Sequence, residues 1–501
     1  MMDGIEASDA QPTSSTVDTK VLLGRKPTSC NASSLGITPP LFISVLAGLL
    51  FGLLIALTGA DPLCPLAIAP NVTACEATPP ADAPALVDTS KSTCGGNGIK
   101  FADAESCTCF ACYTGDTCAE LLDDSSCVLQ LTSGTPFLFE DYWVEHPEAE
   151  ITILPSDHVG YDRQHPRLER SIRALHDLVG NAVTRDRHIV VGIGSTELIS
   201  AALFALAADA NGVDADDGDG EPATVWAAPP FYAGYVEPAS FYESRAFEWH
   251  GATDVPPPVS GAAGCRRIEL VTTPNNPDGH ERTAALPGLA AAADDACDVN
   301  VLADHAYFWP HFVGIDRPVA YSNSTVALFT LSKMTGHASS RIGWAITPSA
   351  AVAERMRTFL AVVALGVPRE PQLRAAAILE HVVAHDGEIF GYARQRMLTR
   401  WKRLEALFGR PAFRAAWRLE PRDPPKLDRF SGEVAYEPSP AYAWLEYLVA
   451  TNVTAPAAML KVGVAGRSGL GYGKDDRYIR LELLMRDVTF DAMMRKLERL
   501  A

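Results

Sequence analysis

The chain has 501 residues, of which 47% are hydrophobic, and this length predicts two or three folded units with ample apolar core. Its formal net charge is -19 at pH 7. Because a strongly acidic surface repels phosphates, this charge argues against nucleic acid as a partner.

The first 93 residues divide into three segments by composition. Residues 1–38 are rich in Ser and Thr and lack periodicity, which predicts a disordered cytoplasmic tail. Residues 39–60 carry no charge and are long enough to cross a bilayer as one helix. Residues 61–93 repeat Pro and Ala, and we expect them to form a stalk.

The apolar run at 39–60 is interpreted as a single-pass transmembrane signal anchor. Lys20, Arg25 and Lys26 precede it and Asp61 follows it. The positive-inside rule therefore puts the tail in the cytoplasm and the rest of the chain in the secretory lumen or outside the cell. A cleaved signal peptide stays open, although such a peptide has a shorter apolar centre nearer the start. A buried core helix is a weaker alternative because no face of the run is polar.

A dense group of cysteines occupies residues 94–127. This density is typical of a disulfide framework in an oxidising compartment, and its members are Cys94, Cys107, Cys109, Cys112, Cys118 and Cys127. Their pairing stays open, and a zinc site built on Cys109 and Cys112 is an alternative. The segment resembles an epidermal-growth-factor-like (EGF-like) module. N-glycosylation, which the predicted topology would allow, has matching triplets at Asn71, Asn323 and Asn452.

From residue 128 the pattern changes to short apolar strands that alternate with helical segments. The predicted strands lie at 188–193, 224–226, 267–272, 299–303 and 326–330. This pattern predicts an α/β fold with a mostly parallel sheet covered on both faces. We assign residues 128–355 to a large domain. This range also contains an N-terminal segment that is expected to pack with the small domain. The acidic stretch 214–221 fails the spacing of a helix-loop-helix calcium site and is expected to be a solvated loop; the sequence predicts no metal site.

The remainder of the chain, 356–501, predicts a smaller α+β C-terminal domain. Long helical patterns come first, followed by a strand at 478–484 and a closing helix at 489–500. Ligands of parallel sheets collect at the carboxyl ends of the strands, so residues that follow strands of the large domain are the first to consider for a site.

Two such strand ends carry groups suited to a phosphate and an aromatic ring. Gly194, Ser195 and Thr196 lie between a strand and a helix start, where backbone N–H groups and hydroxyls can bind a phosphate. Glycine turns are common, so this pattern is weak alone. Tyr232 follows another strand and can lie over a planar ring, with ordinary core packing as the alternative.

Two further strand ends carry polar groups in unusual positions. The segment 273–279 (TPNNPDG) is a turn, and Asn276 within it can donate a hydrogen bond to a ligand. Asp304 follows a buried strand, where a carboxylate is costly unless it is paired. Tyr307 lies three residues later and can act together with Asn276.

The stretch 328–345 predicts a strand, a turn with Lys333 at the strand end, and a second strand. A lysine there can form a Schiff base with the aldehyde of pyridoxal 5'-phosphate, while Ser332 and Arg341 bind its phosphate. The alternative is a surface lysine at a turn. The other strand ends favour the cofactor, because a protonated pyridine nitrogen is the partner that makes Asp304 useful.

The order glycine turn, aromatic residue, Asn-Pro, Asp-x-x-Tyr, Ser-Lys and Arg resembles that of fold-type I pyridoxal-phosphate enzymes. From about residue 94 onward the chain resembles the alliinase and tryptophan aminotransferase-related family. The motifs that carry this resemblance are 176–182 (HDLVGNA), 273–279, 307–311 (YFWPH), 331–341 (LSKMTGHASSR), 368–373 (PREPQL) and 477–481 (RYIRL). The cysteine module matches the alliinase branch.

The resemblance implies a role for each of these residues. Lys333 would hold the cofactor covalently, Asp304 its ring nitrogen, and Tyr232 would stack on the ring. Its phenolic oxygen would contact Asn276 and Tyr307, and its phosphate would contact Gly194, Ser195, Thr196, Ser332 and Arg341.

The resemblance also implies that Arg480 binds the substrate carboxylate and that the protein is a homodimer with active sites at the subunit boundary. Two departures stand out. Thr135 lies where relatives often carry Asp. The segment before Arg167 lacks an obvious match for the phosphate-binding tyrosine given by the neighbouring subunit, for which Tyr161 is a candidate.

The function predicted from these residues is conversion of L-amino acids, with an aminotransferase favoured. The same residues also serve an alliinase-type carbon-sulfur lyase that acts on S-alkyl-L-cysteine sulfoxides by β-elimination. A catalytically inactive, membrane-tethered binding protein is a remote alternative, because such a protein is expected to have lost Lys333, Asp304 or Arg480.

Overall fold

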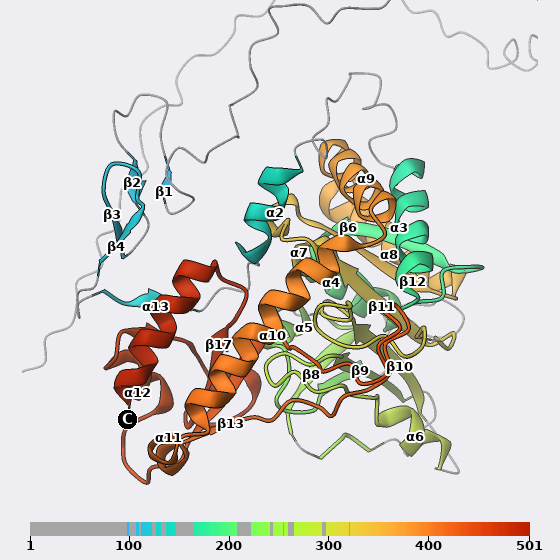
Figure 1. Ribbon diagram of the computed structural model, residues 1–501. Coiled ribbons are helices and arrows are strands. Elements are labelled where there is room, and N and C mark those ends of the chain that lie inside the picture. Colours follow the sequence, from blue (N-terminus) through green and yellow to red (C-terminus); the bar gives the residue numbers. More distant parts are fainter. Residues whose placement is uncertain are drawn as a thin grey trace, which may run out of the picture. The chain divides into compact units, whose positions relative to one another are not determined.

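A computed structural model describes residues 98–99, 107–109, 112–122, 127–131, 137–146, 164–207, 222–240, 244–253, 255–258, 265–292, 297–319 and 321–500 (Figure 1). The predicted tail, anchor and stalk lie outside these residues, as do Thr135, Tyr161 and the acidic stretch 214–221. Within the described residues, no helix combines the length and the apolar character that a bilayer crossing requires.

The centre of the fold is a seven-stranded sheet. Its strands are β6 (His188–Ile193), β7 (Ala223–Ala227), β8 (Phe247–Ala252), β9 (Arg266–Thr272), β10 (Asp298–Asp304), β11 (Thr325–Thr330) and β12 (Ile342–Thr347). They lie in the order β6-β12-β11-β10-β9-β7-β8. Only β12 pairs antiparallel with its neighbours in this sheet, so the predicted mostly parallel sheet is confirmed.

Both faces of this sheet are buried, as its apolar strands predict. On β11, Ala327 and Phe329 belong to one hydrophobic cluster, whereas Val326 and Leu328 belong to another. Successive side chains of a strand point to opposite faces, so the two clusters lie on opposite sides of the sheet.

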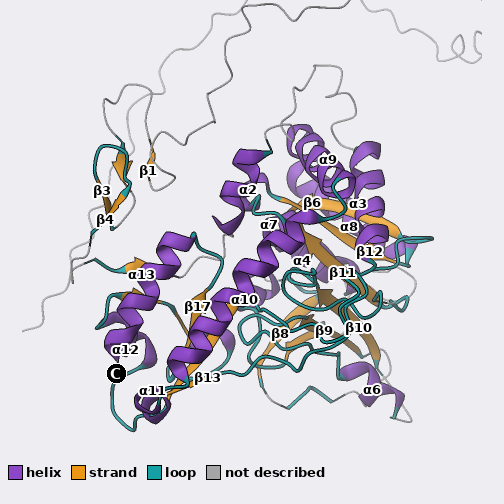
Figure 2. Cartoon of the chain, viewed as in Figure 1, coloured by secondary structure: helices purple, strands orange, loops and turns teal. Residues whose placement is uncertain are grey.

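Helices supply the other half of each cluster, and Figure 2 shows these helices beside the strands of the sheet. On one side, α4 (Gly194–Leu206) packs against α8 (Ala350–Ala364). On the other, α3 (Pro166–Val179) packs against α9 (Arg369–Ala384). Short helices connect the strands: α5 (Val236–Ser240), α6 (Leu286–Ala291) and α7 (Leu331–Met334), with 3-10 turns η5 (Ala233–Tyr235) and η6 (Ala338–Ser340).

The C-terminal part contains a second, antiparallel sheet in the order β13-β14-β17-β16. These strands are β13 (Trp417–Leu419), β14 (Tyr442–Tyr447), β16 (Arg467–Ser468) and β17 (Tyr478–Glu482). The helices here are α10 (Glu388–Phe408), α11 (Pro411–Ala416), α12 (Ala455–Leu460) and α13 (Asp487–Leu497), with 3-10 turns η7 (Gly469–Tyr472) and η8 (Glu498–Leu500). The predicted domain boundary between residues 355 and 356 falls inside α8, and the domain division stays a prediction.

The N-terminal described residues form short elements, and two disulfides link residues within 109–127. These elements are β1 (Gly98–Ile99), β2 (Thr108–Cys109), β3 (Tyr113–Thr114), β4 (Glu120–Leu121), β5 (Leu129–Gln130), η1 (Phe137–Phe139) and α2 (Glu140–Glu145). Cys109 pairs with Cys118 and Cys112 with Cys127, which removes the thiolates that the zinc alternative requires. The EGF-like resemblance stays a prediction.

Three further contacts join distant parts of the chain. β5 pairs in parallel with β15 (Val464–Ala465), and the buried Lys496 ammonium donates to the Cys127 carbonyl at 2.9 Å. A disulfide that the sequence analysis missed joins Cys265 to Cys297, at the starts of the parallel neighbours β9 and β10.

Candidate active site

The predicted site residues of the large domain follow strands that end at one edge of the central sheet. β6, β9, β10 and β11 run in the same direction, because β6 and β11 are both antiparallel to β12. Gly194 follows β6, Asn276 follows β9, Asp304 ends β10 and Lys333 follows β11. The fold therefore gathers these residues where a parallel sheet binds ligands.

The start of α4 has a geometry suited to an anion. Its first turn is closed by Glu197, whose carboxylate accepts a 2.6 Å bond from the Ile193 N–H group. Gly194 has a positive φ of 73°, and a Cβ there would lie 2.5 Å from Nη2 of Arg341. Glycine thus lets the Arg341 guanidinium lie against the helix start, where N–H groups and the helix dipole favour an anion.

Ser332 and Lys333 lie in α7 rather than in the predicted turn. Thr330 caps this helix, and its hydroxyl accepts from the Ser332 N–H at 3.2 Å and donates to the Ser332 hydroxyl at 3.0 Å. His311 donates from Nε2 to the Lys333 carbonyl at 3.3 Å. Both ends of this short helix are held, so the position of Lys333 on the strand end is fixed.

Asp304 is a buried carboxylate with a raised pKa. Burial raises the pKa of Asp304 from 3.8 to about 6, against the opposing effects of the Ala306 N–H, the Tyr235 hydroxyl and the Lys333 charge. The Ala306 N–H donates a hydrogen bond to the Asp304 carboxylate at 3.0 Å, and the Tyr235 hydroxyl donates one at 3.2 Å. Tyr235, which the sequence analysis missed, is also bonded to Thr272 at 2.6 Å. A cation placed beside this carboxylate would offset its burial.

Asn276, Tyr307 and Arg480 form a buried network with Tyr442. Arg480 donates from Nη1 to the Asn276 oxygen at 3.0 Å, which turns the Asn276 amide nitrogen toward the Tyr307 hydroxyl at 3.4 Å. Tyr307 and Tyr442 share a bond of 2.8 Å, and the Arg480 guanidinium carbon lies 3.8 Å from the Tyr442 ring centre. The C-terminal sheet thereby supplies Arg480 and Tyr442 to the site of the large domain.

Tyr232 lies in the same region. Burial is the main reason that its phenol pKa is raised, and the charge of Asp304 adds to this effect while that of Arg480 opposes it. Its ring meets that of Tyr235 edge-on, with centroids 5.4 Å apart. Ser195 is half-buried, and Thr196 and Arg341 are exposed, so the side of the site at the start of α4 is open to solvent.

Glu482 is a titratable group that the sequence analysis missed. It lies two residues after Arg480 on β17, so both side chains project from the same face of the strand. Burial raises its pKa from 4.5 to about 7, while Arg480 and Lys333 oppose that rise. The signal in the sequence was the alternation of charged residues in 480–482 within an otherwise apolar strand.

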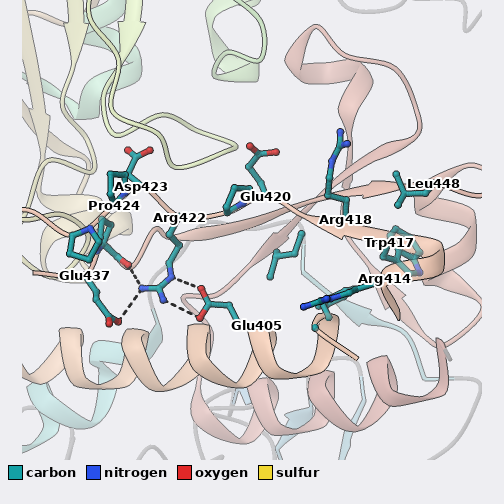
Figure 3. Close-up of a pocket in the computed structure, with 16 residues that line it drawn as sticks. Glu405, Arg414, Trp417, Arg418, Glu420, Arg422, Asp423, Pro424, Glu437 and Leu448 are labelled. Carbon is teal, nitrogen blue, oxygen red and sulfur yellow. Dashed lines mark hydrogen bonds and ion pairs between the residues drawn. The ribbon is translucent and has the colours of Figure 1, made fainter. Parts of the chain in front are cut away.

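A cavity of about 680 Å³ lies elsewhere, beside α10 and β13, and contains none of these residues (Figure 3). Arg422 spans it through bonds of 2.7 and 3.0 Å to Glu405 and an ion pair of 3.5 Å with Glu437. Glu420 and Asp423, which also line this cavity, pair instead with His280.

Comparison with known proteins gives consistent results. The family model described as allinase matches residues 129–501. Tryptophan aminotransferase-related protein 4 of Arabidopsis thaliana is 31% identical over 424 residues, covering 81% of this chain and 86% of that protein. Alliin lyase 2 of Allium sativum is 29% identical over 427 residues, covering 79% and 82%.

Solved structures share the fold. An aminotransferase from Staphylococcus aureus matches with a TM-score of 0.52 at 16% identity, covering 74% of this chain and 93% of that one. The aspartate aminotransferase from Thermus thermophilus with maleate also gives 0.52 at 16% identity, covering 75% and 92%.

Proposed function

The chain belongs to the allinase family, and we propose that it is a pyridoxal 5'-phosphate-dependent enzyme that converts L-amino acids, with transamination to 2-oxo acids as its main reaction. The observation that carries this proposal is the buried Asp304 carboxylate at the same sheet edge as Lys333 and the anion cradle of α4. One ligand with a phosphate, a basic ring nitrogen and an aldehyde matches all three.

The donors and acceptors present fit this cofactor. A phosphate would bind the first turn of α4 together with Ser195, Thr196, Ser332 and Arg341. Asp304 would hold the protonated ring nitrogen and lose the cost of its burial, and Tyr232 would cover the ring. Asn276 and Tyr307 present an amide N–H and a hydroxyl for the phenolic oxygen.

The cofactor, when bound, supplies a covalent attachment for the amino group and an electron sink for the α-carbon. Arg480 then binds the substrate carboxylate as a planar two-point donor, held in place by Asn276 and the Tyr442 ring. Lys333, once released from the cofactor, acts as the general base that takes the α-proton and as the acid that returns it. The buried surroundings of Arg480 strengthen its hold on a carboxylate.

Two reactions use these same residues. Transamination moves the α-amino group to a second 2-oxo acid, and the named aminotransferase-related relatives support it. β-Elimination from an S-alkyl-L-cysteine sulfoxide, with water, gives pyruvate, ammonia and a sulfenic acid. The relatives named alliin lyase and the disulfide-bonded N-terminal segment support this second candidate.

One pair of assays separates the two. The purified protein is given an aromatic L-amino acid with a 2-oxo acid acceptor, and separately an S-alkyl-L-cysteine sulfoxide, with Lys333→Ala as the blank. We expect transfer to the acceptor in the first assay. Stoichiometric pyruvate and ammonia from the sulfoxide, without transfer in the first assay, would make the protein a lyase.

We further propose that the protein is a homodimer, anchored by residues 39–60 with its catalytic part in the secretory lumen or outside the cell. Disulfides in the described residues and the exposed Asn323 and Asn452 support this side of the membrane. Glycosidase treatment of protein from a secretory host should increase its electrophoretic mobility. If a protease added to intact microsomes from the cytosolic side digests the C-terminal part, the orientation is the opposite of the one proposed.

A further inference from the structure

Three histidines from two distant segments converge outside the proposed active site. His381 and His385 lie one turn apart at the end of α9, and His146 directly follows α2. Their potential ligand nitrogens all lie within 4.8 Å of one another. The ring centroids are 4.0 Å apart for His381 and His385 and 4.8 Å apart for His146 and His381.

Hydrogen bonds orient two of these rings. Nδ1 of His385 lies 2.9 Å from the His381 carbonyl, which can only accept, so Nδ1 carries the proton. In neutral His385 the lone pair is therefore on Nε2, the nitrogen left to face a ligand. The Tyr142 hydroxyl lies 3.2 Å from Nε2 of His381, and the hydrogen bond between them orients the His381 ring. Such partners fix ring orientation at metal sites.

Exposure across the cluster is graded. His381 is buried, His146 half-buried and His385 exposed, so the cluster has a closed inner side and an open outer side. Tyr142 and Trp143 pack against His381, with ring centroids 6.2 and 5.6 Å away. An ion can enter from solvent, and a water can complete its coordination.

We propose that His146, His381 and His385 bind one divalent transition-metal ion of the zinc class through neutral imidazoles. Two histidines one helical turn apart with a third from another segment form a three-nitrogen face, which suits Zn²⁺ better than the oxygen-seeking Mg²⁺ or Ca²⁺. Tetrahedral bonds of about 2.0–2.1 Å place ligand nitrogens about 3.4 Å apart. A small movement of the half-buried His146 toward His381 and His385 would bring the nitrogens, now within 4.8 Å of one another, to that spacing.

The ion would join α2 to α9 near the segment that carries Lys333. Trp143 of α2 donates to the Thr335 carbonyl, directly after α7, at 2.7 Å, and its ring lies 4.8 Å from that of His337. The metal would therefore hold α2 against the end of α7. It is a structural clip, separate from the cofactor chemistry, and it does not depend on the proposed reaction.

The test uses the full-length protein without a histidine tag, stripped of metal by chelator and titrated with ZnCl₂ alone in a calorimeter. The variants are His385→Ala and His146→Ala, and the matched control is His250→Ala, an exposed histidine on β8. We expect one ion per chain in the parent and in the control, with affinity at least tenfold weaker in both cluster variants.

Two further readouts complete the test. Zn²⁺ should raise the melting temperature of the parent and the control but not of His385→Ala, and Co²⁺ should give nitrogen-ligand visible bands without thiolate charge transfer. Absence of binding in the parent would overturn the proposal. Equal binding by the parent and by His385→Ala would overturn it as well. Because the His385 side chain is exposed, its replacement should leave the fold intact, so that a loss of binding reports the missing ligand.

Discussion

Replacing Asp304 with Asn should separate stability from activity. Each pKa unit is worth roughly 1.4 kcal/mol, so raising the Asp304 pKa from 3.8 to about 6 costs the charged form about 3 kcal/mol in the cofactor-free protein. Asn keeps the shape and removes the charge. Its oxygen can accept from the Ala306 N–H, and its amide can donate to Tyr235, whose proton then goes to Thr272.

The sign of the pH dependence follows from the raised pKa. Between pH 3.8 and about 6 the folded state binds more protons at Asp304 than the unfolded state, so this group lowers the free energy of unfolding as pH rises. The loss is complete above pH 6. Cofactor-free Asp304→Asn should therefore be more stable than the parent at pH 7.5, with the difference vanishing toward pH 4.

Activity should change in the opposite direction. Without the carboxylate the ring nitrogen loses its charged partner, and we expect kcat to fall by about 10²–10³, the range for losing one preorganised electrostatic partner. Urea unfolding of the cofactor-free proteins and single-turnover kinetics of the loaded proteins measure the two effects. Activity within twofold of the parent, or a cofactor-free variant less stable than the parent at pH 7.5, would refute this reasoning.

Three other substitutions test separate parts of the site. Gly194→Ala places a Cβ 2.5 Å from Arg341 at a residue with positive φ. The affinity for the cofactor, measured by fluorescence titration, should therefore fall by about 10–100-fold. Gly391→Ala, which has open space around it, is the control and should bind the cofactor as the parent does. Arg480→Lys keeps the charge but loses the planar fork, so KM for the amino acid should rise by about tenfold or more. An unchanged KM would show that Arg480 does not bind the substrate carboxylate. Arg477→Lys, at an exposed position, is the control. Glu482→Gln should abolish a fall in unfolding free energy, on the order of 3 kcal/mol, that its raised pKa produces between pH 4.5 and about 7; an unaltered pH profile would contradict that pKa.

The residues at the strand ends were predictable because the pattern that marks each strand also marks where it ends. Asp304 is the last residue of a buried strand and Lys333 follows another, and parallel strands bring such positions to one edge. The prediction of a turn at Lys333 was wrong in detail, since Thr330 caps a short helix there. That difference depends on one side-chain hydrogen bond, which periodicity does not reveal.

The partners of these residues were not predictable, because they come from other parts of the chain. Tyr235 reaches Asp304 from a 3-10 turn, and Tyr442 reaches Tyr307 from a sheet 135 residues away. Neither tyrosine lies in a motif. The Cys265 disulfide likewise depends on the pairing of β9 with β10, and the histidine cluster depends on the packing of α2 near α9. Such sites follow from tertiary contacts rather than from local spacing.

The attachment of the cofactor to Lys333 can be measured directly by borohydride reduction of the loaded protein, followed by proteolysis and mass mapping of the pyridoxyl-lysine peptide. We expect the label on Lys333 and its loss in Lys333→Ala, which should still bind the cofactor reversibly through the start of α4. A label on another lysine, or covalent trapping that persists in Lys333→Ala, would contradict this role of Lys333.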